Sequence, residues 1–257
     1  MMKSEQRQWT RETLWSPERV ELSASADLVL IFGETAVLKD PGIFTDIRKA
    51  YPKAHLFGCS TAGEIYGTRV CDGSVTTTAI DFESTQVRAA SVHMAQVRDS
   101  YEAGTRLAGL LEHEGLTHLL ALSVGLNVNG SELVRGLTEK LPKGVGVTGG
   151  LAGDQARFTE TLVISDAAPS SDLVAVIGLY GSSIEVGSAS LVEGAVRKGA
   201  KKRGLSGSTA KCEEAVFDAG RTLARPRRSL DERMPESRTE GARRRAGRLG
   251  PFRARLG

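Results

Sequence analysis

Two short segments of the chain combine glycines, hydroxyl groups and one carboxylate each, a composition that suits the binding of a small ligand. They are Gly58-Cys-Ser-Thr-Ala-Gly-Glu64 and Gly149-Gly-Leu-Ala-Gly-Asp154. Glycine lets the backbone come close to a bound molecule, and small polar side chains beside loop N–H groups can hold it. The carboxylates of Glu64 and Asp154 can bind a ligand amine while loop N–H groups hold its carboxylate, which favours an amino-acid-like molecule. The alternative is that these glycines serve only tight turns and close packing.

The two segments each follow an apolar, strand-like run. Ligands of open α/β sheets bind in a crevice at the carboxyl ends of the strands, so the loops at 58–64, 125–131 and 149–154 are expected to converge on one pocket. The predicted ligand-binding residues are Cys59, Ser60, Thr61, Glu64, Asn127, Asn129, Gly149, Gly150, Gly153 and Asp154.

The segment from Gly58 to Ala62 also resembles the nucleophile elbow of hydrolases, with Ser60 or Cys59 as the nucleophile. A triad needs an oriented base, and no Asp–His pairing can be argued from the sequence for His55 or for the histidines that follow. No catalytic residue is therefore assigned, and a serine or cysteine hydrolase stays the alternative function.

Other site types find less support. The stretch 144–149 matches GxGxxG, but it follows a helix end, whereas a dinucleotide fingerprint follows a strand and opens a helix. The four histidines lack HxxxH or HExxH spacing, and the three cysteines form no CxxC pair, so no metal site is expected.

The elements that must position these residues follow from hydrophobic patterning. Residues 27–33 and 54–58 are predicted strands around a helix at 40–50, a strand–helix–strand unit. Residues 74–82 and 86–94 are expected to form an antiparallel hairpin. Helices are predicted at 101–114 and 129–141, and strands at 117–123, 158–165 and 172–180. The predicted fold class is α/β or α+β, a mixed sheet with packed helices in which a βαβ start is followed by antiparallel strands.

Composition divides the 257-residue chain into three parts. Residues 1–19 are a polar N-terminal extension, 20–190 a folded domain, and 191–257 a basic tail with 18 Lys/Arg against 8 Asp/Glu. The tail is expected to be disordered, or the product of a shifted reading frame. It is the one part suited to nucleic acid, although it lacks the aromatic residues that stack on single strands. No run reaches the length of a membrane span and the N-terminus lacks a leader pattern, so a cytoplasmic protein is expected.

Five segments in order resemble the FIST N domain family (F-box and intracellular signal transduction). They are Leu56-Phe-Gly-Cys-Ser-Thr-Ala-Gly-Glu-Ile65, Asp72-Gly-Ser-Val75, Gly125-Leu-Asn-Val-Asn-Gly-Ser-Glu-Leu133, Val147-Thr-Gly-Gly-Leu-Ala-Gly-Asp154 and Ile177-Gly-Leu-Tyr-Gly181. The resemblance covers residues 27–190.

The resemblance implies a bacterial, non-catalytic sensory domain that binds a small ligand such as an amino acid or similar metabolite. It also implies a signalling partner such as a kinase, a cyclase or a chemoreceptor. Some members are linked to haem and nitric oxide sensing. No haem ligand is assigned to His55, His93, His113 or His118, so no cofactor is expected and haem or nitric oxide sensing stays a lesser alternative. Members usually continue into a second, C-terminal FIST domain, whereas here the basic tail begins at Leu191.

Overall fold

Two β-sheets build the part of the chain that the computed structural model describes, residues 2–187 and 216–218. The first, sheet 1, has the strand order β11-β4-β3-β7-β1-β2. Its strands β3 and β4 are parallel neighbours, and β7 runs antiparallel between β3 and β1. Their bounds are β1 Lys3–Thr10, β2 Leu14–Ser16, β3 Leu28–Gly33, β4 His55–Ser60, β7 Val75–Asp81 and β11 Val163–Ser165.

The second, sheet 2, has the order β13-β10-β9-β12-β8, with β9 and β10 parallel and β12 antiparallel to both of its neighbours. A separate hairpin joins β5 to β6. The bounds are β5 Glu64–Tyr66, β6 Arg69–Cys71, β8 Gln86–His93, β9 Leu116–Ser123, β10 Gly146–Leu151, β12 Leu173–Tyr180 and β13 Val216–Asp218.

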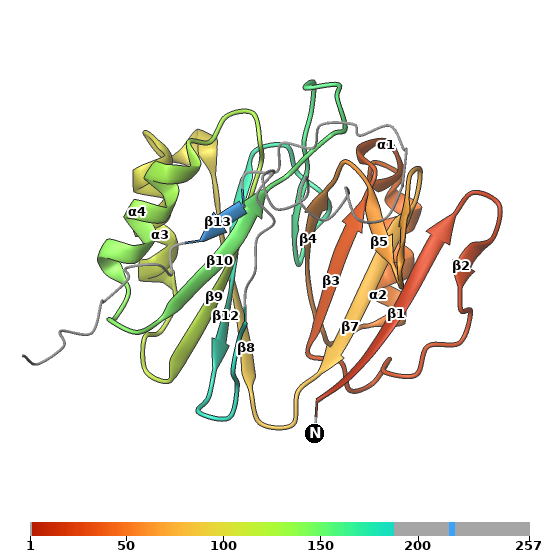
Figure 1. Cartoon of the computed structure of the whole chain (residues 1–257), viewed down its shortest axis with the longest axis horizontal. Coiled ribbons are helices and arrows are strands. Elements are labelled where there is room, and N and C mark those ends of the chain that lie inside the picture. Colours follow the sequence, from red (N-terminus) through yellow and green to blue (C-terminus); the bar gives the residue numbers. More distant parts are fainter. Residues whose placement is uncertain (1, 188–215, 219–257) are drawn as a thin grey trace, which may run out of the picture. The chain divides into compact units, whose positions relative to one another are not determined.

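Helices cover the outer face of each sheet (Figure 1). They are α1 Thr35–Leu38 and α2 Pro41–Ala50 on sheet 1, and α3 Ser100–Leu110 and α4 Gly130–Lys140 on sheet 2, with a short 3₁₀ helix at Met94–Gln96. Local sequence explains each longer helix start, because the side chains of Asp40, Asp99 and Asn129 accept a backbone N–H of the first turn.

Three apolar clusters hold these layers together. One lies between α3, α4 and sheet 2, and a second lies between α1, α2 and sheet 1. The third fills the space between the sheets, where Phe57 of β4 packs with Leu122 of β9 and Ile177 of β12. Strand alternation sends neighbouring residues to different clusters, as with Val29 on the helix side and Leu28 between the sheets.

The predicted fold class, mixed β-structure with packed helices, is confirmed, as is the parallel β3–α2–β4 unit. The single mixed sheet that the sequence predicted is divided into two sheets in the structure. The predicted hairpin of 74–82 with 86–94 is wrong, because β7 belongs to sheet 1 and β8 to sheet 2. Both edges of β7 are already occupied, by β1 and by β3. The chain therefore crosses to the second sheet at 82–85 instead of folding back.

Three other segments differ from expectation. Within 1–19, predicted as an extension, β1 pairs with β7 along Lys3–Trp9 and β2 pairs with β1. The predicted strand 158–165 is shortened to β11. Residues 158–160 form a turn instead, because their N–H groups donate to the buried carboxylate of Asp154. The tail at 191–257 lies outside the described residues except for β13, which pairs with β10.

Candidate functional site

The two glycine-containing segments lie side by side at the carboxyl ends of parallel strands. The Gly153 N–H donates to the Ser60 carbonyl at 2.9 Å, directly linking the first segment to the second. Beside this contact, the Ala152 N–H donates to the Ser123 carbonyl at the end of β9 at 2.8 Å. The ends of β4, β9 and β10 are thus joined through backbone hydrogen bonds.

Two of the glycines permit close strand packing rather than ligand contact. A Cβ on Gly58 would lie 1.8 Å from the Ile31 carbonyl oxygen of β3. A Cβ on Gly149 would lie 1.9 Å from the Ala121 carbonyl oxygen of β9. No real Cβ atom comes this close to a backbone oxygen, so these positions require glycine for the sheets themselves.

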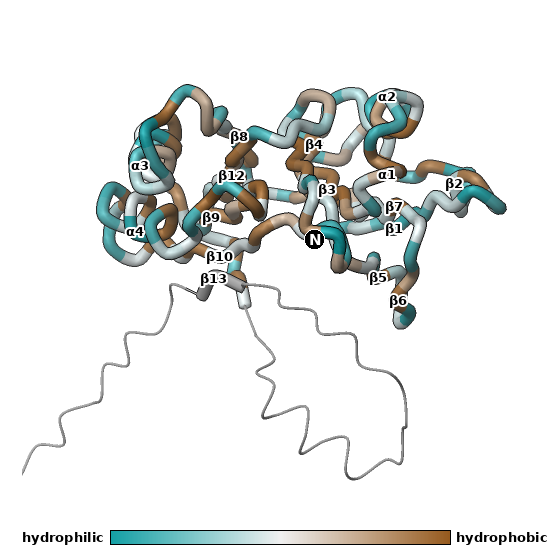
Figure 2. Tube along the Cα trace, turned by 90° about the horizontal axis from the view of Figure 1, so that it is seen from above, coloured by the Kyte–Doolittle hydropathy of each residue, from teal (hydrophilic) through white to brown (hydrophobic). Residues whose placement is uncertain are grey.

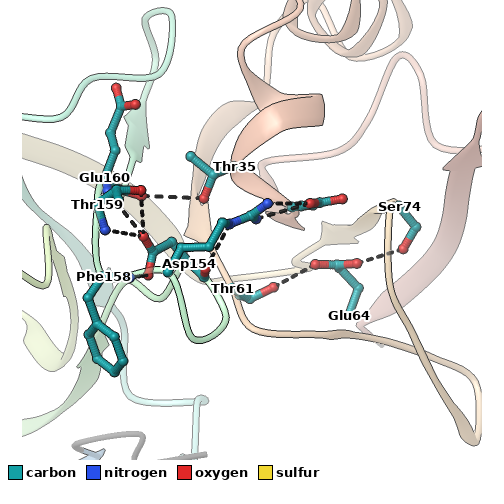
Figure 3. A network of polar contacts seen from close by, with 10 residues as sticks. Thr35, Thr61, Glu64, Ser74, Asp154, Phe158, Thr159 and Glu160 are labelled. Atoms are coloured by element: carbon teal, nitrogen blue, oxygen red, sulfur yellow. Dashed lines mark hydrogen bonds and ion pairs between the residues drawn. The ribbon is translucent and has the colours of Figure 1, made fainter.

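Asp154 organises the turn that follows the second segment (Figure 3). Its side chain is buried and accepts the N–H groups of Phe158 at 3.0 Å, Thr159 at 2.7 Å and Glu160 at 3.0 Å, together with the Thr159 hydroxyl at 3.3 Å. Burial alone would raise the pKa of Asp154, but these donors stabilise the carboxylate and hold its pKa below the ordinary value. The Phe158 ring points away from this network and is 74% exposed.

An ion pair connects the same turn to the end of β3. Both terminal nitrogens of Arg157 lie 3.0 Å from one carboxylate oxygen of Glu34, which immediately follows β3. The Arg157 Nε donates to the Asp154 carbonyl at 3.1 Å. The turn is therefore fixed to sheet 1 by a side-chain bridge in addition to its internal hydrogen bonds.

Glu64 is a buried carboxylate with hydroxyl partners. Thr61 and Ser74 each donate to it at 2.8 Å, and within the described residues it forms no ion pair. Burial raises the pKa of Glu64, although the two hydroxyl donors oppose that effect. Its carboxylate joins the first segment to the start of β7 and lies at the base of the β5–β6 hairpin.

The candidate nucleophiles are both enclosed. Ser60 is fully buried, and its Oγ accepts the Leu162 N–H at 2.9 Å. Cys59 is buried among the apolar side chains between the sheets. Neither side chain is presented to solvent, so the structure adds no support to the hydrolase alternative.

The structure does contain an Asp–His pair that the sequence did not reveal. His55 Nδ1 lies 2.7 Å from Asp166 Oδ2 at the start of β4, the end opposite Ser60. The Asp166 hydrogen bond raises the pKa of His55 against the opposing effect of burial. Arg48 donates to the same aspartate at 3.1 Å. The pair is separated in sequence by 111 residues, which is why no local motif indicated it.

The third predicted loop, 125–131, follows the carboxyl end of β9. The Gly125 N–H at its start donates to the Thr161 hydroxyl at 2.8 Å. Asn127 and Asn129 are exposed, and Asn129 caps α4 by accepting the Glu132 N–H at 3.2 Å. A Cβ on Gly150 would meet no atom within 4 Å.

A cavity of about 530 Å³ lies beside these loops, on the helix side of sheet 1. Its apolar lining includes Leu38, Phe44 and Leu162, and its rim carries the ion pair of Lys39 with Glu160. The full lining is Leu38, Lys39, Pro41, Phe44, Thr45, Glu160, Leu162, Ala168, Pro169, Ser170 and Ser171.

The loop residues hold one wall of this cavity from behind. Asp154 binds the Glu160 N–H, and Ser60 binds the Leu162 N–H. The Thr35 hydroxyl also donates to the Glu160 carbonyl at 3.5 Å. None of the lining residues was predicted, because they come from three separated segments with no pattern in common. Their nearest sequence signal is the Asp40-Pro41 helix start, which places α2 but not the cavity.

Comparison with protein families gives one match, in which the family described as FIST N domain matches residues 27–193. The chain belongs to the FIST N domain family. FIST N domains are sensory domains of signal transduction, so the chain has a sensory role. A search of curated proteins found no match.

The FIST N match spans β3 to β12, both glycine-containing segments and every residue lining the cavity. Within the described part of the chain, no helix has the length and apolar character of a membrane span. The same residues contain no cluster of three or more metal-ligating side chains.

Proposed function

We propose that this FIST N domain senses a small zwitterionic metabolite, of the amino-acid class, in the cavity beside α1 and α2. The observation that carries the proposal is the combination of an apolar floor with one cation and one anion, Lys39 and Glu160, on the rim. A volume of about 530 Å³ is within the range of small-molecule sites.

The two rim charges match the two charges of such a ligand. The Lys39 ammonium would hold its carboxylate, Glu160 would hold its ammonium, and the side chain would lie against Phe44 and Leu162. Lys39 is half exposed and Glu160 about one-third exposed. Exposed ion pairs contribute little to the free energy of folding. Replacing the Lys39–Glu160 pair by two contacts with the ligand therefore loses little stability.

In this proposal the loop segments support the cavity wall. The side chains of Asp154 and Ser60 accept backbone N–H groups of residues 158–162. In this proposal they therefore position Glu160 and Leu162 and do not contact the ligand. Glu64 remains a second candidate for the ligand amine, because its partners are neutral. The output would pass to a signalling protein such as a kinase, a cyclase or a chemoreceptor.

Thermal unfolding of the full chain with each amino acid tests the proposal. A ligand at 100 times its Kd stabilises by about 2.7 kcal/mol, a rise in Tm of roughly 5–10 °C for a domain of this size. The matching amine without a carboxylate and the acid without an amine should each give a much smaller shift.

Variants locate the site. Lys39→Gln and Glu160→Gln should each abolish the ligand-induced shift, while Glu132→Gln, which removes an ion pair on α4, should leave it intact. A shift that survives both rim variants but disappears in Glu64→Gln would move the site to the loops. If no zwitterion stabilises the protein, the proposed ligand class is wrong.

A further inference from the structure

Strand β8 forms one end of sheet 2 and is the longest edge strand among the described residues. It pairs with β12 along all of its eight residues, and no strand in this part of the chain pairs with its other side. Figure 2 shows β8 at the end of the sheet opposite β13. All eight residues of β12 are buried, whereas only one residue of β8 is.

Hydrogen bonding shows which backbone groups of β8 point outward. The Met94 N–H donates to the Asp172 carbonyl at 2.9 Å, which continues the ladder beyond the pair of His93 with Leu173. Alternate residues of an antiparallel pair bond to the partner. Even-numbered residues of β8 therefore face β12, and the odd-numbered residues direct their N–H and C=O groups to the open side.

Side chains lie at both ends of this open side. At one end the His55 ring lies beside the Val87 backbone, and at the other the Ala95 N–H donates to the Asp172 carboxylate at 3.2 Å. Ala89, Ser91 and His93 lie between them. Within the described residues, the outward N–H and C=O groups of these three residues have no partner.

The open segment lacks the features that usually protect an edge strand, such as proline, lysine or a bulge. Its residues are small, from Ala89 to Val92. Arg88 does not block the edge, because its guanidinium bonds Glu112 at 2.7 Å and stacks over the Tyr180 ring at 5.2 Å.

We infer that β8 is a dimer interface, in which a second copy of this chain adds its own β8 antiparallel across a two-fold axis at Ser91. This register places Ser91 opposite Ser91 of the second copy and Ala89 opposite its His93. All of the outward groups then find partners, because the open residues are symmetric about Ser91. Arg88 lies opposite Met94, so no like charges face each other. The interface is isologous, as a two-fold axis requires.

Sedimentation velocity of the full chain over a range of concentrations tests this inference. The wild-type chain should dimerise, and Ser91→Pro should weaken the dimer at least tenfold, because proline removes an outward N–H without touching the β12 ladder. Ser91→Thr keeps that N–H and should still dimerise. Circular dichroism and thermal unfolding establish that each variant is folded.

A cysteine at the axis gives a second readout that does not depend on the proline variant. Opposed residues of a hydrogen-bonded antiparallel pair have Cα atoms about 5.5 Å apart, within disulfide range. Ser91→Cys should therefore form a covalent dimer on mild oxidation, whereas Ser84→Cys, in the connection between β7 and β8, and the wild-type chain should not. A wild-type chain that stays monomeric, a dimer that persists in folded Ser91→Pro, or equal cross-linking of both cysteine variants would overturn the inference.

Discussion

Replacement of Asp154 by asparagine tests whether this carboxylate holds the turn that builds the cavity wall. Asparagine keeps one oxygen for the Phe158 N–H but turns an NH₂ donor toward the N–H groups of Thr159 and Glu160. Each lost bond to a charged acceptor costs about 1–3 kcal/mol. Because the turn is exposed and water can replace part of this, we expect a loss of about 2–3 kcal/mol.

Urea unfolding measures this loss. With a slope of about 2 kcal/mol per molar urea, the midpoint should fall by roughly 1–1.5 M. Asp46→Asn is the matched control, since Asp46 is exposed on α2 and its side chain makes no hydrogen bond or ion pair within the described residues. The pKa of Asp154 is lowered on folding, so its contribution is present above the unfolded pKa of about 3.9. It is lost as pH falls through the folded value.

The gap between the wild-type chain and Asp154→Asn should therefore shrink below about pH 4. A midpoint no lower than that of Asp46→Asn would refute the reasoning, because the turn would then form without the carboxylate. A gap that stays constant down to about pH 2 would refute its electrostatic part.

Three further outcomes follow from other contacts. Gly136→Ala should cost about 2–4 kcal/mol in urea unfolding, because its Cβ would lie 2.2 Å from a backbone carbonyl of α3; Gly109→Ala, with open space around it, should be neutral or slightly stabilising. The His55–Asp166 hydrogen bond raises the pKa of His55, so this contact stabilises the fold fully below the unfolded pKa of about 6.5. That stabilisation is lost as pH rises through the folded pKa. An NMR titration of the ring should show the pKa of His55 returning toward its ordinary value in Asp166→Asn. Since burial raises the pKa of Glu64, stability should fall as pH rises through that pKa, and Glu64→Gln should remove this component from a pH series of urea midpoints.

Sequence patterns were sufficient where burial and local chemistry act together. The apolar run of β3 and the Asp40-Pro41 helix start predicted the parallel strand–helix–strand unit. Because parallel strands end at one edge, they also predicted that the two glycine-containing segments would meet. The β7–β8 hairpin failed because local alternation does not reveal that both edges of β7 are already paired.

The site was less predictable because its parts come from distant segments. The carboxylate of Asp154 pointed to this region of the chain. Its partners could not be predicted, because they are backbone N–H groups whose position depends on the turn. Lys39 and Glu160 are ordinary surface residues in the sequence. They meet because β11 pairs with β4, a contact that no local pattern contains.

The pairing of β4 with β11 also sets the order in which the domain can be completed. Ser60 and Leu162, which bond across this junction, are 102 residues apart, and most of sheet 2 lies between them in the sequence. Closing such a long loop is entropically costly and slows folding. During synthesis the edge of β4 stays open until the segment 162–165 has left the ribosome. The cavity wall is therefore among the last parts to form, so the ligand site that we propose for this cavity can exist only in a nearly complete domain.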